Sequence, residues 1–251
     1  MYGLVYLLGF LAAAFLGRRS FPCFENTPLY TLYIAVLAAL GAIIGGRLGY
    51  ALFYEPGYYL EHPAEIPLLY LGGMSFHGGL LGLLLAVLLA DIRGFWTNLD
   101  RMAFLACLIL PLGRIANFLN GELWGTPCAY SWCVIFEAAG DGLPRHPVQL
   151  YEAVLEGPAL LVLILAFRHF LKEWARVPGV TAALFGIGYA LLRCGVEFFR
   201  EPDPVTGYLW RGFTRGQGLC AIMLLAGFAM LLLRLRARRD SIPEAGRGDM
   251  N

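Results

Sequence analysis

The chain has 251 residues, of which 59% are hydrophobic and 15% are charged, and its mean hydropathy is +0.63. Soluble domains carry about 25% charged residues, so this composition excludes an ordinary soluble domain and indicates a protein of the bilayer. The net charge of +1 does not provide the basic surface that nucleic acids require, and we expect no nucleic-acid partner.

Seven apolar segments are candidates to cross a bilayer, for which a helix needs about 20 residues. The first and third are short, so they extend into neighbouring glycine-rich sequence or are partly re-entrant. Arg18 and Arg19 follow the first segment, which is the reverse of a secretory signal, and we expect this segment to remain as a span. In chain order the segments are 2–16, 29–53, 78–90, 99–118, 148–167, 180–198 and 218–235.

The basic residues orient these spans, because cytoplasmic loops are enriched in Lys and Arg. With seven spans, twelve basic residues fall on one side and four on the other, while Arg47, Arg114 and Arg193 lie within spans. We therefore predict an all-α, polytopic membrane protein with an outside N-terminus and a cytoplasmic C-terminus. It forms one domain over 1–251, with outer loops 54–76, 119–147 and 199–217 and a flexible tail at 236–251.

A glycine-rich motif, G-G-M-S-F-H-G-G at 72–79, leads into the third span. Glycines let a backbone approach a ligand closely, and the N–H groups at a helix start favour anions. His77 lies within this run. A lone histidine usually has a structural role, but an imidazole that titrates near ~6.5 also accepts protons at neutral pH.

The most polar stretch within an apolar run is G-R-I-A-N-F-L-N-G-E-L-W-G at 113–125. An arginine, two asparagines and a glutamate occur here within nine residues. In a bilayer each charge costs roughly 2.5–3.5 kcal/mol on insertion scales, and such residues are functional by default. We expect the chemistry in this segment.

The loop after this segment contains Cys128 and Cys133, for which a disulfide and two unpaired thiols are both compatible with the sequence. We do not interpret these cysteines as nucleophiles. The six cysteines of the chain include no C-x-x-C pair and no His/Cys group with metal-ligand spacing, so we expect no metal site.

The fifth and sixth spans carry further polar groups. The fifth opens with H-P-V-Q-L-Y-E at 146–152, whose side chains we assign mostly to capping and packing. On the sixth, Tyr189, Arg193 and Glu197 share one helix face, and Arg200 falls near the same stripe. A polar stripe on an apolar helix faces protein or a water-filled cavity.

Two interpretations of Arg47, Arg114 and Arg193 remain open at this point. Each arginine pairs with a buried acid or a backbone carbonyl and locks helices together, or the arginines form a cationic cavity for a phosphate, which their planar forks grip in two places. We favour the phosphate cavity. The acids available for internal pairing are Glu122, Glu152, Glu156 and Glu197.

Taken together, these motifs resemble the prolipoprotein diacylglyceryl transferase family of bacteria. The segment 113–125 resembles the family signature throughout its length. Val148 departs from the pattern, because the family usually has Ser or Thr there. The motifs that also fit, in order, are Y-G-L-V-Y at 2–6, G-G-R-L-G-Y at 45–50, and those at 72–79, 146–152 and 193–203.

The resemblance implies a multi-pass enzyme of the bacterial inner membrane that acts in lipoprotein biosynthesis. It takes the diacylglyceryl group from phosphatidylglycerol and places it on the lipobox cysteine of a prolipoprotein, forming a thioether and releasing glycerol phosphate. The activated group arrives on the lipid, so no cofactor is implied. By motif position the functional residues fall on Tyr2, His77, Arg114, Asn117, Glu122, Gly125, Tyr189, Arg193 and Glu197.

The reaction assigns roles to these residues. We expect Arg114 and Arg193 to hold the phosphate, joined by Arg200, and His77 to accept the thiol proton. The remaining residues support them: Glu122 and Glu197 orient the arginines or balance their charge, Asn117, Gly125 and Tyr189 bind the headgroup, and Tyr2 lies near the glycerol.

Three other functions are weighed against this one. A transporter would show a repeated pair of broken helices, which the sequence lacks. A silent scaffold would not retain the Arg, His, Asn and Glu positions of the motifs. A metal-dependent enzyme acting on lipid headgroups would carry an Asp-rich motif, and the sequence has none.

Overall fold

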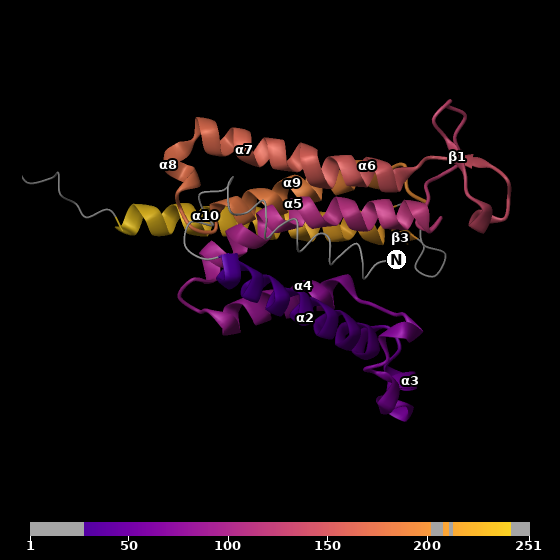
Figure 1. Ribbon diagram of the computed structural model, residues 1–251, viewed down its shortest axis with the longest axis horizontal. Coiled ribbons are helices and arrows are strands. Elements are labelled where there is room, and N and C mark those ends of the chain that lie inside the picture. The colour runs from indigo at the N-terminus through magenta and orange to yellow at the C-terminus, as the bar shows by residue number, and fades with distance from the viewer. Residues whose placement is uncertain (1–27, 202–207, 211–212, 242–251) are drawn as a thin grey trace, which may run out of the picture. The chain divides into compact units, whose positions relative to one another are not determined.

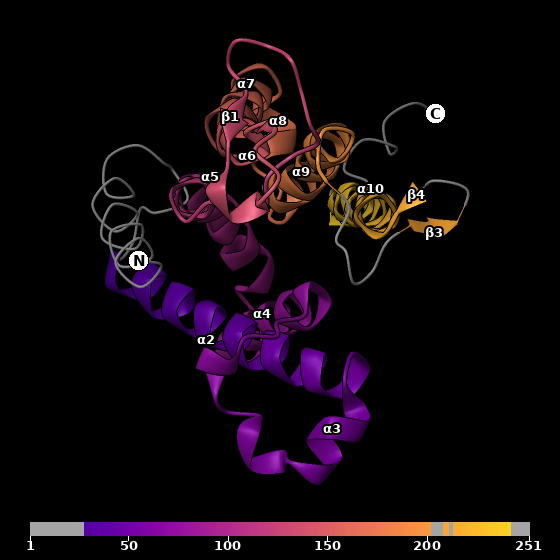
Figure 2. The same cartoon turned by 90° about the vertical axis from the view of Figure 1, so that its right-hand side faces the viewer.

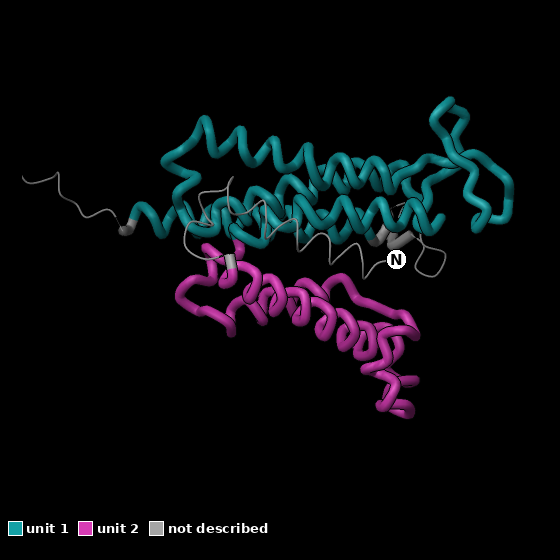
Figure 3. The backbone as a smooth tube through the Cα atoms, viewed as in Figure 1, with its two compact units in different colours: residues 1–15, 100–251 teal, residues 16–99 magenta. Residues whose placement is uncertain are grey.

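The computed structural model describes residues 28–201, 208–210 and 213–241 (Figure 1). The first predicted span, 2–16, and with it Tyr2, lies outside these residues. The chain divides into two compact units: unit 1 comprises residues 1–15 and 100–251, and unit 2 comprises residues 16–99 (Figure 3).

Unit 2 consists mainly of two helices that pack along each other, α2 (Pro28–Phe53) and α4 (Phe76–Ala90) (Figure 1). The connection between them contains three short helical turns. These are α3 (Pro56–Glu61), η2 (Pro63–Glu65) and η3 (Leu69–Leu71).

Glycines form the contact between α2 and α4. A Cβ on Gly45 would overlap the carbonyl oxygen of Gly78, and a Cβ on Gly78 would overlap that of Gly45. Gly41 and Gly82 are related in the same way. Small residues at this spacing let two helix backbones approach closely, which favours association in lipid. The structure thus gives Gly78 a helix-packing role, where the sequence had suggested close approach to a ligand.

Unit 1 is a bundle of helices that run side by side (Figures 1 and 2). Contacts join α9 to α10 and to the helical stretch that begins at Val148. The helices are α5 (Phe95–Leu119, entering from unit 2), α6 (Val148–Val154), the π-helical segment η5 (Leu155–Ala159), α7 (Leu160–Phe170), α8 (Lys172–Ala175), α9 (Val180–Glu197) and α10 (Arg215–Ser241).

Two small antiparallel hairpins complete unit 1. β1 (Val134–Ile135) pairs with β2 (Pro144–Arg145), and a short 3-10 turn, η4 (Glu137–Ala139), lies between them. β3 (Tyr208–Trp210) pairs with β4 (Phe213–Thr214). Both hairpins lie in loops that we predicted to be outer loops, so the helical prediction holds for the bulk of the chain and not for these loops.

A π-helical turn interrupts the long helical stretch from Val148 to Phe170. Pro158 lies inside this turn and has no N–H to donate, so the regular helical ladder cannot pass through it. Gly157 faces α5 here, because a Cβ on it would overlap the side chain of Pro111. This close approach brings Glu156 beside α5.

Asp100 ties the start of α9 to α5. Its Oδ2 accepts a hydrogen bond from Gly179 N at 2.8 Å, and its Oδ1 accepts one from Ala182 N at 2.7 Å. An acidic side chain satisfies the free N–H groups at a helix start and complements the helix dipole. The side chain therefore holds α9 in register with α5.

The described residues contain five helices long and apolar enough to cross a membrane. They coincide with five of the predicted segments to within about four residues at each end. The predicted segment 78–90 corresponds to α4, an apolar helix of 15 residues. The five are Leu29–Phe53, Phe95–Leu119, Val148–Phe170, Val180–Glu197 and Gly216–Arg239.

The protein is thus a mostly helical, multi-pass membrane protein. The count of seven spans, the orientation of the termini and the division into one domain with three outer loops stay predictions. The predicted tail at 236–251 begins as helix, because α10 continues to Ser241. Residues 242–251 lie outside the described part of the chain.

Candidate active site

Six ionisable side chains of unit 1 form one group, which we call the ion cluster. Three are arginines and three are glutamates. They come from α5, from the α6–η5 stretch, from α9 and from the residues just after α9. The members of the ion cluster are Arg114, Glu152, Glu156, Arg193, Glu197 and Arg200.

Arg114 forms a bidentate interaction with Glu156. Its Nε and Nη2 donate hydrogen bonds to the two carboxylate oxygens of Glu156, at 3.0 and 3.3 Å. Its Nη1 lies 3.1 Å from Oε2 of Glu152. A bidentate pair of this kind fixes the plane of the guanidinium group.

Glu152 contacts all three arginines of the cluster. Besides its contact with Arg114, its Oε1 accepts a hydrogen bond from Arg200 Nη1 at 3.0 Å and lies 3.7 Å from Arg193 Nε. Arg193 also pairs with Glu197, one helical turn further along α9, with Nη1 and Oε2 2.5 Å apart. This last pair confirms that Arg193 and Glu197 share one helix face.

The carboxylates are more deeply buried than the arginines. The side chains of Glu152 and Glu156 have no exposed surface, whereas those of Arg114, Arg193 and Arg200 expose 18%, 14% and 20%. The acids therefore lie behind the guanidinium groups. With every member ionised, the three positive and three negative charges cancel.

These contacts bear on the two interpretations of the arginines, internal pairing with acids and a cationic cavity for phosphate. Arg114 and Arg193 are paired internally with acids, as the first interpretation expected. Pairing alone does not exclude phosphate binding, because an arginine presents five N–H donors and keeps part of its surface exposed here. It does mean that the six side chains of the cluster carry no excess of positive charge among themselves.

Arg47 has a different environment and lies in unit 2. Its Nε donates to Ile66 O at 2.7 Å, its Nη2 donates to Glu65 O at 2.9 Å, and its Nη1 donates to Gly72 O and to Gly73 O. The residue is only 2% exposed. Arg47 thus locks the connection between α2 and α4 through backbone carbonyls, and it is not part of the ion cluster.

Two further predicted residues lie on the helices that carry the cluster. Tyr189 is buried one turn before Arg193 on α9, and its ring stacks on Phe185 at 5.9 Å between centroids. Asn117 follows Arg114 on α5 and is half-buried. Their positions agree with a shared site, while their roles toward a headgroup stay predictions.

Glu122 and the backbone after α5 are held by polar contacts. The Glu122 carboxylate accepts a hydrogen bond from Asn120 Nδ2 at 2.8 Å, and its carbonyl accepts one from Gln149 Nε2 at 2.7 Å. Its N–H donates to Asn117 O at 3.0 Å. The signature therefore folds back onto the end of its own helix and onto α6.

Gly125 lies where three segments cross. Its N–H donates to His146 O at 2.9 Å, and it pairs as an isolated β-bridge with Arg200. A Cβ on this residue would lie 2.7 Å from Val148 Cγ1 and would also overlap the carbonyl oxygen of Phe199. Packing accounts for glycine at this position, and a direct contact with substrate stays a prediction.

His77 is the second residue of α4 and its side chain is exposed. Ser75 precedes the helix and its Oγ accepts a hydrogen bond from Gly78 N at 3.3 Å, which caps the helix start. His77 belongs to unit 2 and the ion cluster to unit 1. Its role as the base therefore stays a prediction.

Comparison with known proteins decides the family. A family model described as "Prolipoprotein diacylglyceryl transferase" matches residues 1–233. The chain belongs to this family.

Curated relatives carry the name phosphatidylglycerol–prolipoprotein diacylglyceryl transferase. The relative from Bordetella parapertussis is 45% identical over 241 residues, which cover 94% of this chain and 90% of the relative. The one from Bordetella avium is 46% identical, over 96% of this chain and 91% of the relative. The one from Nitratidesulfovibrio vulgaris is 46% identical, over 92% and 88%.

Sequence reasoning did not include two members of the ion cluster, Glu152 and Glu156, among the site residues of this diacylglyceryl transferase. From the sequence, Glu156 is considered only as an acid available for pairing, and Glu152 also as part of the motif at 146–152, which is assigned mostly to capping and packing. Both lie on one helical stretch, four residues apart, inside an otherwise apolar run. That spacing was the available signal, and the π-helical turn that aims Glu156 at α5 could not be seen in the sequence.

The predicted outer loop 119–147 contains a buried arginine that the sequence analysis missed. Arg145 forms ion pairs with Asp141 and Glu201, and its Nη1 donates to Gly125 O at 3.1 Å. Trp124 Nε1 donates to the same Glu201 carboxylate at 2.9 Å. Arg145 thereby joins the loop after α5 to the segment after α9, which carries Arg200.

The two loop cysteines form a disulfide, Cys128–Cys133. Their sulfur atoms and a ring nitrogen of His146 lie within 4.8 Å of one another, a grouping that resembles a metal site. Thiolates are the sulfur ligands of metals, and sulfur atoms joined in a disulfide do not supply them. This resolves the alternatives for these cysteines in favour of the disulfide.

Proposed function

We propose that this protein transfers the diacylglyceryl group of phosphatidylglycerol to the lipobox cysteine of a prolipoprotein in the bacterial inner membrane. The thiol sulfur attacks the glyceryl carbon, a carbon–sulfur bond forms, and the bond from that carbon to the phosphate oxygen breaks. Glycerol phosphate leaves and the thiol proton passes to a base. Family membership supports the reaction, and the ion cluster is the observation that carries its assignment to residues.

The ion cluster suits a leaving group whose negative charge grows. The phosphodiester of the lipid carries one negative charge, and the departing phosphate monoester carries about 1.5 to 2 at neutral pH. Donors that are already oriented stabilise such charge without reorganising. Glu152, Glu156 and Glu197 hold the arginines in place while the site is empty. Arg114, Arg193 and Arg200 present their exposed surface to the phosphate.

The thiol must lose its proton, since the thiolate is the nucleophile and a free thiol has a pKa near ~8.5. His77 is the proposed base, at the exposed start of α4. Tyr189, Asn117, Glu122 and Gly125 complete the headgroup pocket. Tyr2, outside the described residues, is proposed to lie near the glycerol.

The membrane arrangement belongs to the same proposal. Seven spans place the N-terminus outside and the C-terminus in the cytoplasm, in one catalytic domain. The loops 119–147 and 199–217 then face outward, beside Arg200 and the end of α5. The activated group arrives on the lipid, so the reaction requires no metal or organic cofactor.

A direct assay tests the reaction class. The purified protein is incubated with phosphatidylglycerol and a synthetic lipobox peptide, and the peptide is weighed by mass spectrometry. We expect a mass gain equal to one diacylglyceryl group, and no gain when the peptide cysteine is replaced by serine. A mass gain on the serine peptide would contradict the proposal, and so would the absence of a mass gain on the cysteine peptide when the protein is folded and phosphatidylglycerol is present.

A further inference from the structure

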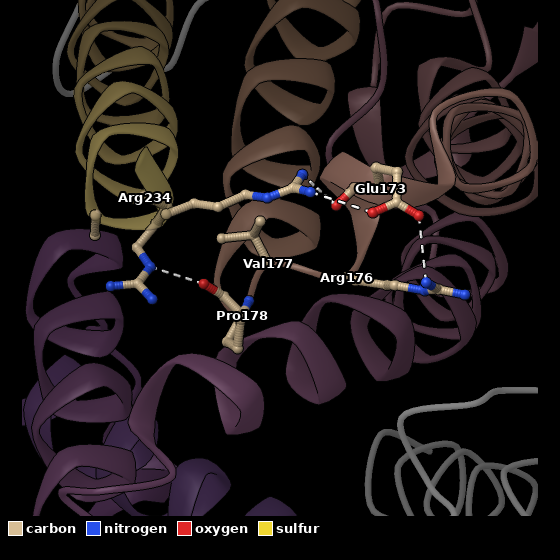
Figure 4. Close-up of a pocket in the computed structure, with 7 residues that line it drawn as sticks. Glu173, Arg176, Val177, Pro178 and Arg234 are labelled. Atoms are coloured by element: carbon tan, nitrogen blue, oxygen red, sulfur yellow. Dashed lines mark hydrogen bonds and ion pairs between the residues drawn. The ribbon is translucent and has the colours of Figure 1, made fainter. Parts of the chain in front are cut away.

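A second charged site lies in unit 1, at the end of the bundle opposite the β1–β2 hairpin. A cavity of about 510 Å³ opens where α8, the connection before α9 and the last turns of α10 meet (Figure 4). Figure 1 shows α8 and β1 at opposite ends of this unit. The cavity is therefore separate from the ion cluster, which lies beside the outer loops.

The cavity walls carry an excess of positive charge. Arg176, Arg234 and Arg238 line it together with one acid, Glu173, which gives the lining a formal charge of +2. Glu173 bridges two of the arginines: its Oε1 lies 3.3 Å from Arg176 Nη1 and its Oε2 lies 3.2 Å from Arg238 Nη2. This contrasts with the ion cluster, where acids and arginines are equal in number.

Backbone carbonyls fix two of these arginines in place. Arg234 Nε donates to Pro178 O at 2.7 Å, and Arg238 Nη1 donates to Glu173 O at 2.6 Å (Figure 4). The guanidinium of Arg238 also lies over the ring of Trp174, 5.1 Å from its centroid. Orientation by neutral carbonyls and an aromatic ring leaves the positive charge of the site in place.

The cavity lies at the end of a candidate membrane span, where lipid headgroups are expected. Arg234 and Arg238 lie in the last turns of the apolar helix Gly216–Arg239, which is long enough to cross a membrane. Exposed apolar side chains precede the cavity residue Glu173 in the chain, where Phe170 is 79% exposed and Leu171 45% exposed. A charged cavity next to an apolar surface matches an amphipathic ligand with an anionic head.

We propose that this cavity binds the headgroup of an anionic phospholipid, which does not react there. The phosphate lies between Arg234 and Arg238, and the acyl chains follow the exposed apolar end of α7. Basic pockets between membrane helices are suited to anionic headgroups, and about 300–1,000 Å³ is the usual size of a ligand pocket. The site goes beyond the proposed reaction, which takes place at the other end of the bundle.

The test measures lipid binding to the delipidated, full-length protein by native mass spectrometry. Three ligands are titrated: short-chain phosphatidylglycerol, short-chain phosphatidylcholine and inorganic phosphate. The variant Arg234→Gln/Arg238→Gln is compared with Arg236→Gln/Arg239→Gln. This control removes two exposed arginines of the same helix that do not line the cavity.

We expect the cavity variant to bind one phosphatidylglycerol molecule fewer than the wild type, or to bind the most weakly held molecule with a Kd about ten-fold higher. The reason is that two forked donors to phosphate are lost. The control variant retains wild-type binding, and phosphatidylcholine does not distinguish the variants. Equal binding of phosphatidylglycerol by all three proteins would overturn the proposal. Saturation of the cavity by inorganic phosphate at the same concentrations would overturn the assignment to a lipid.

A second variant tests the cavity without removing its arginines, in case their loss affects folding. Ala237 lines the cavity, and Ala237→Phe fills it without changing its charge. This variant is also expected to lose the lipid. Turnover of the lipobox peptide is measured for every variant and should stay near the wild-type rate, since no residue of the ion cluster is changed. A loss of lipid binding with normal turnover thus supports this site independently of the proposed reaction.

Discussion

Arg47 in unit 2 and Arg114 in unit 1 are both arginines within apolar helices, yet they are held in opposite ways. Four backbone carbonyls accept hydrogen bonds from Arg47, and it is 2% exposed. Arg114 is held by two carboxylates, and its side chain is 18% exposed. From the sequence, both arginines are charged residues within apolar spans and have the same two possible roles. The difference between them separates the structural role of Arg47 from the catalytic role proposed for Arg114.

The chemistry of the partners explains this separation. Carbonyls of the chain itself cannot be exchanged for a ligand without unfolding the connection that they form. A phosphate, in contrast, is an anion with several acceptor oxygens, as a carboxylate is, and can share an arginine with it. The carboxylates of the ion cluster therefore orient the guanidinium groups and still leave them available. Four changes test this comparison, and the expected effects decrease from the first to the last.

The largest effect is expected at His77, the proposed chemical contribution of unit 2. His77→Gln removes the base, and turnover should fall by about 10²–10⁴-fold at neutral pH. The melting temperature should stay near that of the wild type, because the side chain is exposed. The rate of peptide modification is measured between pH 6 and pH 9. Near-normal turnover over this range would remove His77 from the mechanism.

Arg47→Gln should act on stability instead of chemistry. The shorter side chain leaves several of the four carbonyls without a donor, and each such loss costs about 1–3 kcal/mol when buried. Thermal unfolding in detergent measures the effect. Arg93→Gln, an exposed arginine of the same unit, is the control. A stable Arg47→Gln protein with no activity would place Arg47 with the catalytic arginines and break the comparison.

A substitution in the glycine contact between α2 and α4, called the glycine seam below, should cause a smaller loss of stability. Gly78→Ala places a Cβ against the backbone of Gly45, and overpacking of this kind costs about 1–3 kcal/mol. Gly57→Ala in α3 is the matched control, because nothing lies within 4 Å of its added Cβ. The two melting temperatures are compared. An equal, small change in both would show that the seam does not require glycine.

These changes also show what the sequence could predict. Apolar length predicted the helices, because the bilayer demands about 20 residues whatever their partners are. Arg114, Arg193 and Glu197 could be found because charged residues are conspicuous in apolar runs. The contact between Arg145 and Glu201 could not be found in this way, since the two residues are 56 positions apart and no local pattern links them. The same holds for the glycine seam, where packing partners are far apart in the sequence.

The smallest effect concerns Asp141, in the loop between α5 and α6, and depends on pH. The hydrogen bond from Arg145 lowers the pKa of Asp141 below its ordinary value. A lowered carboxyl pKa stabilises the fold above the unfolded value of about 3.9, and this stability is lost as the pH falls through the folded value. Asp141→Asn should therefore melt slightly below the wild type at pH 6, and the difference should shrink as the pH falls below about 3.9. A difference that does not shrink in acid would exclude this ion pair as its cause.

The central claim is that the carboxylate-backed arginines of unit 1 act on the phosphate of the lipid. The double variant Arg114→Gln/Glu156→Gln tests it most directly, because it removes one arginine and one glutamate together. The remaining charges of the ion cluster stay balanced, and Glu152 keeps its contacts with Arg193 and Arg200, so the cost in stability is small. We predict a melting temperature close to the wild type and a kcat/KM for phosphatidylglycerol about 10²–10³-fold lower. A well-folded double variant that modifies the lipobox peptide at the wild-type kcat/KM would contradict the account.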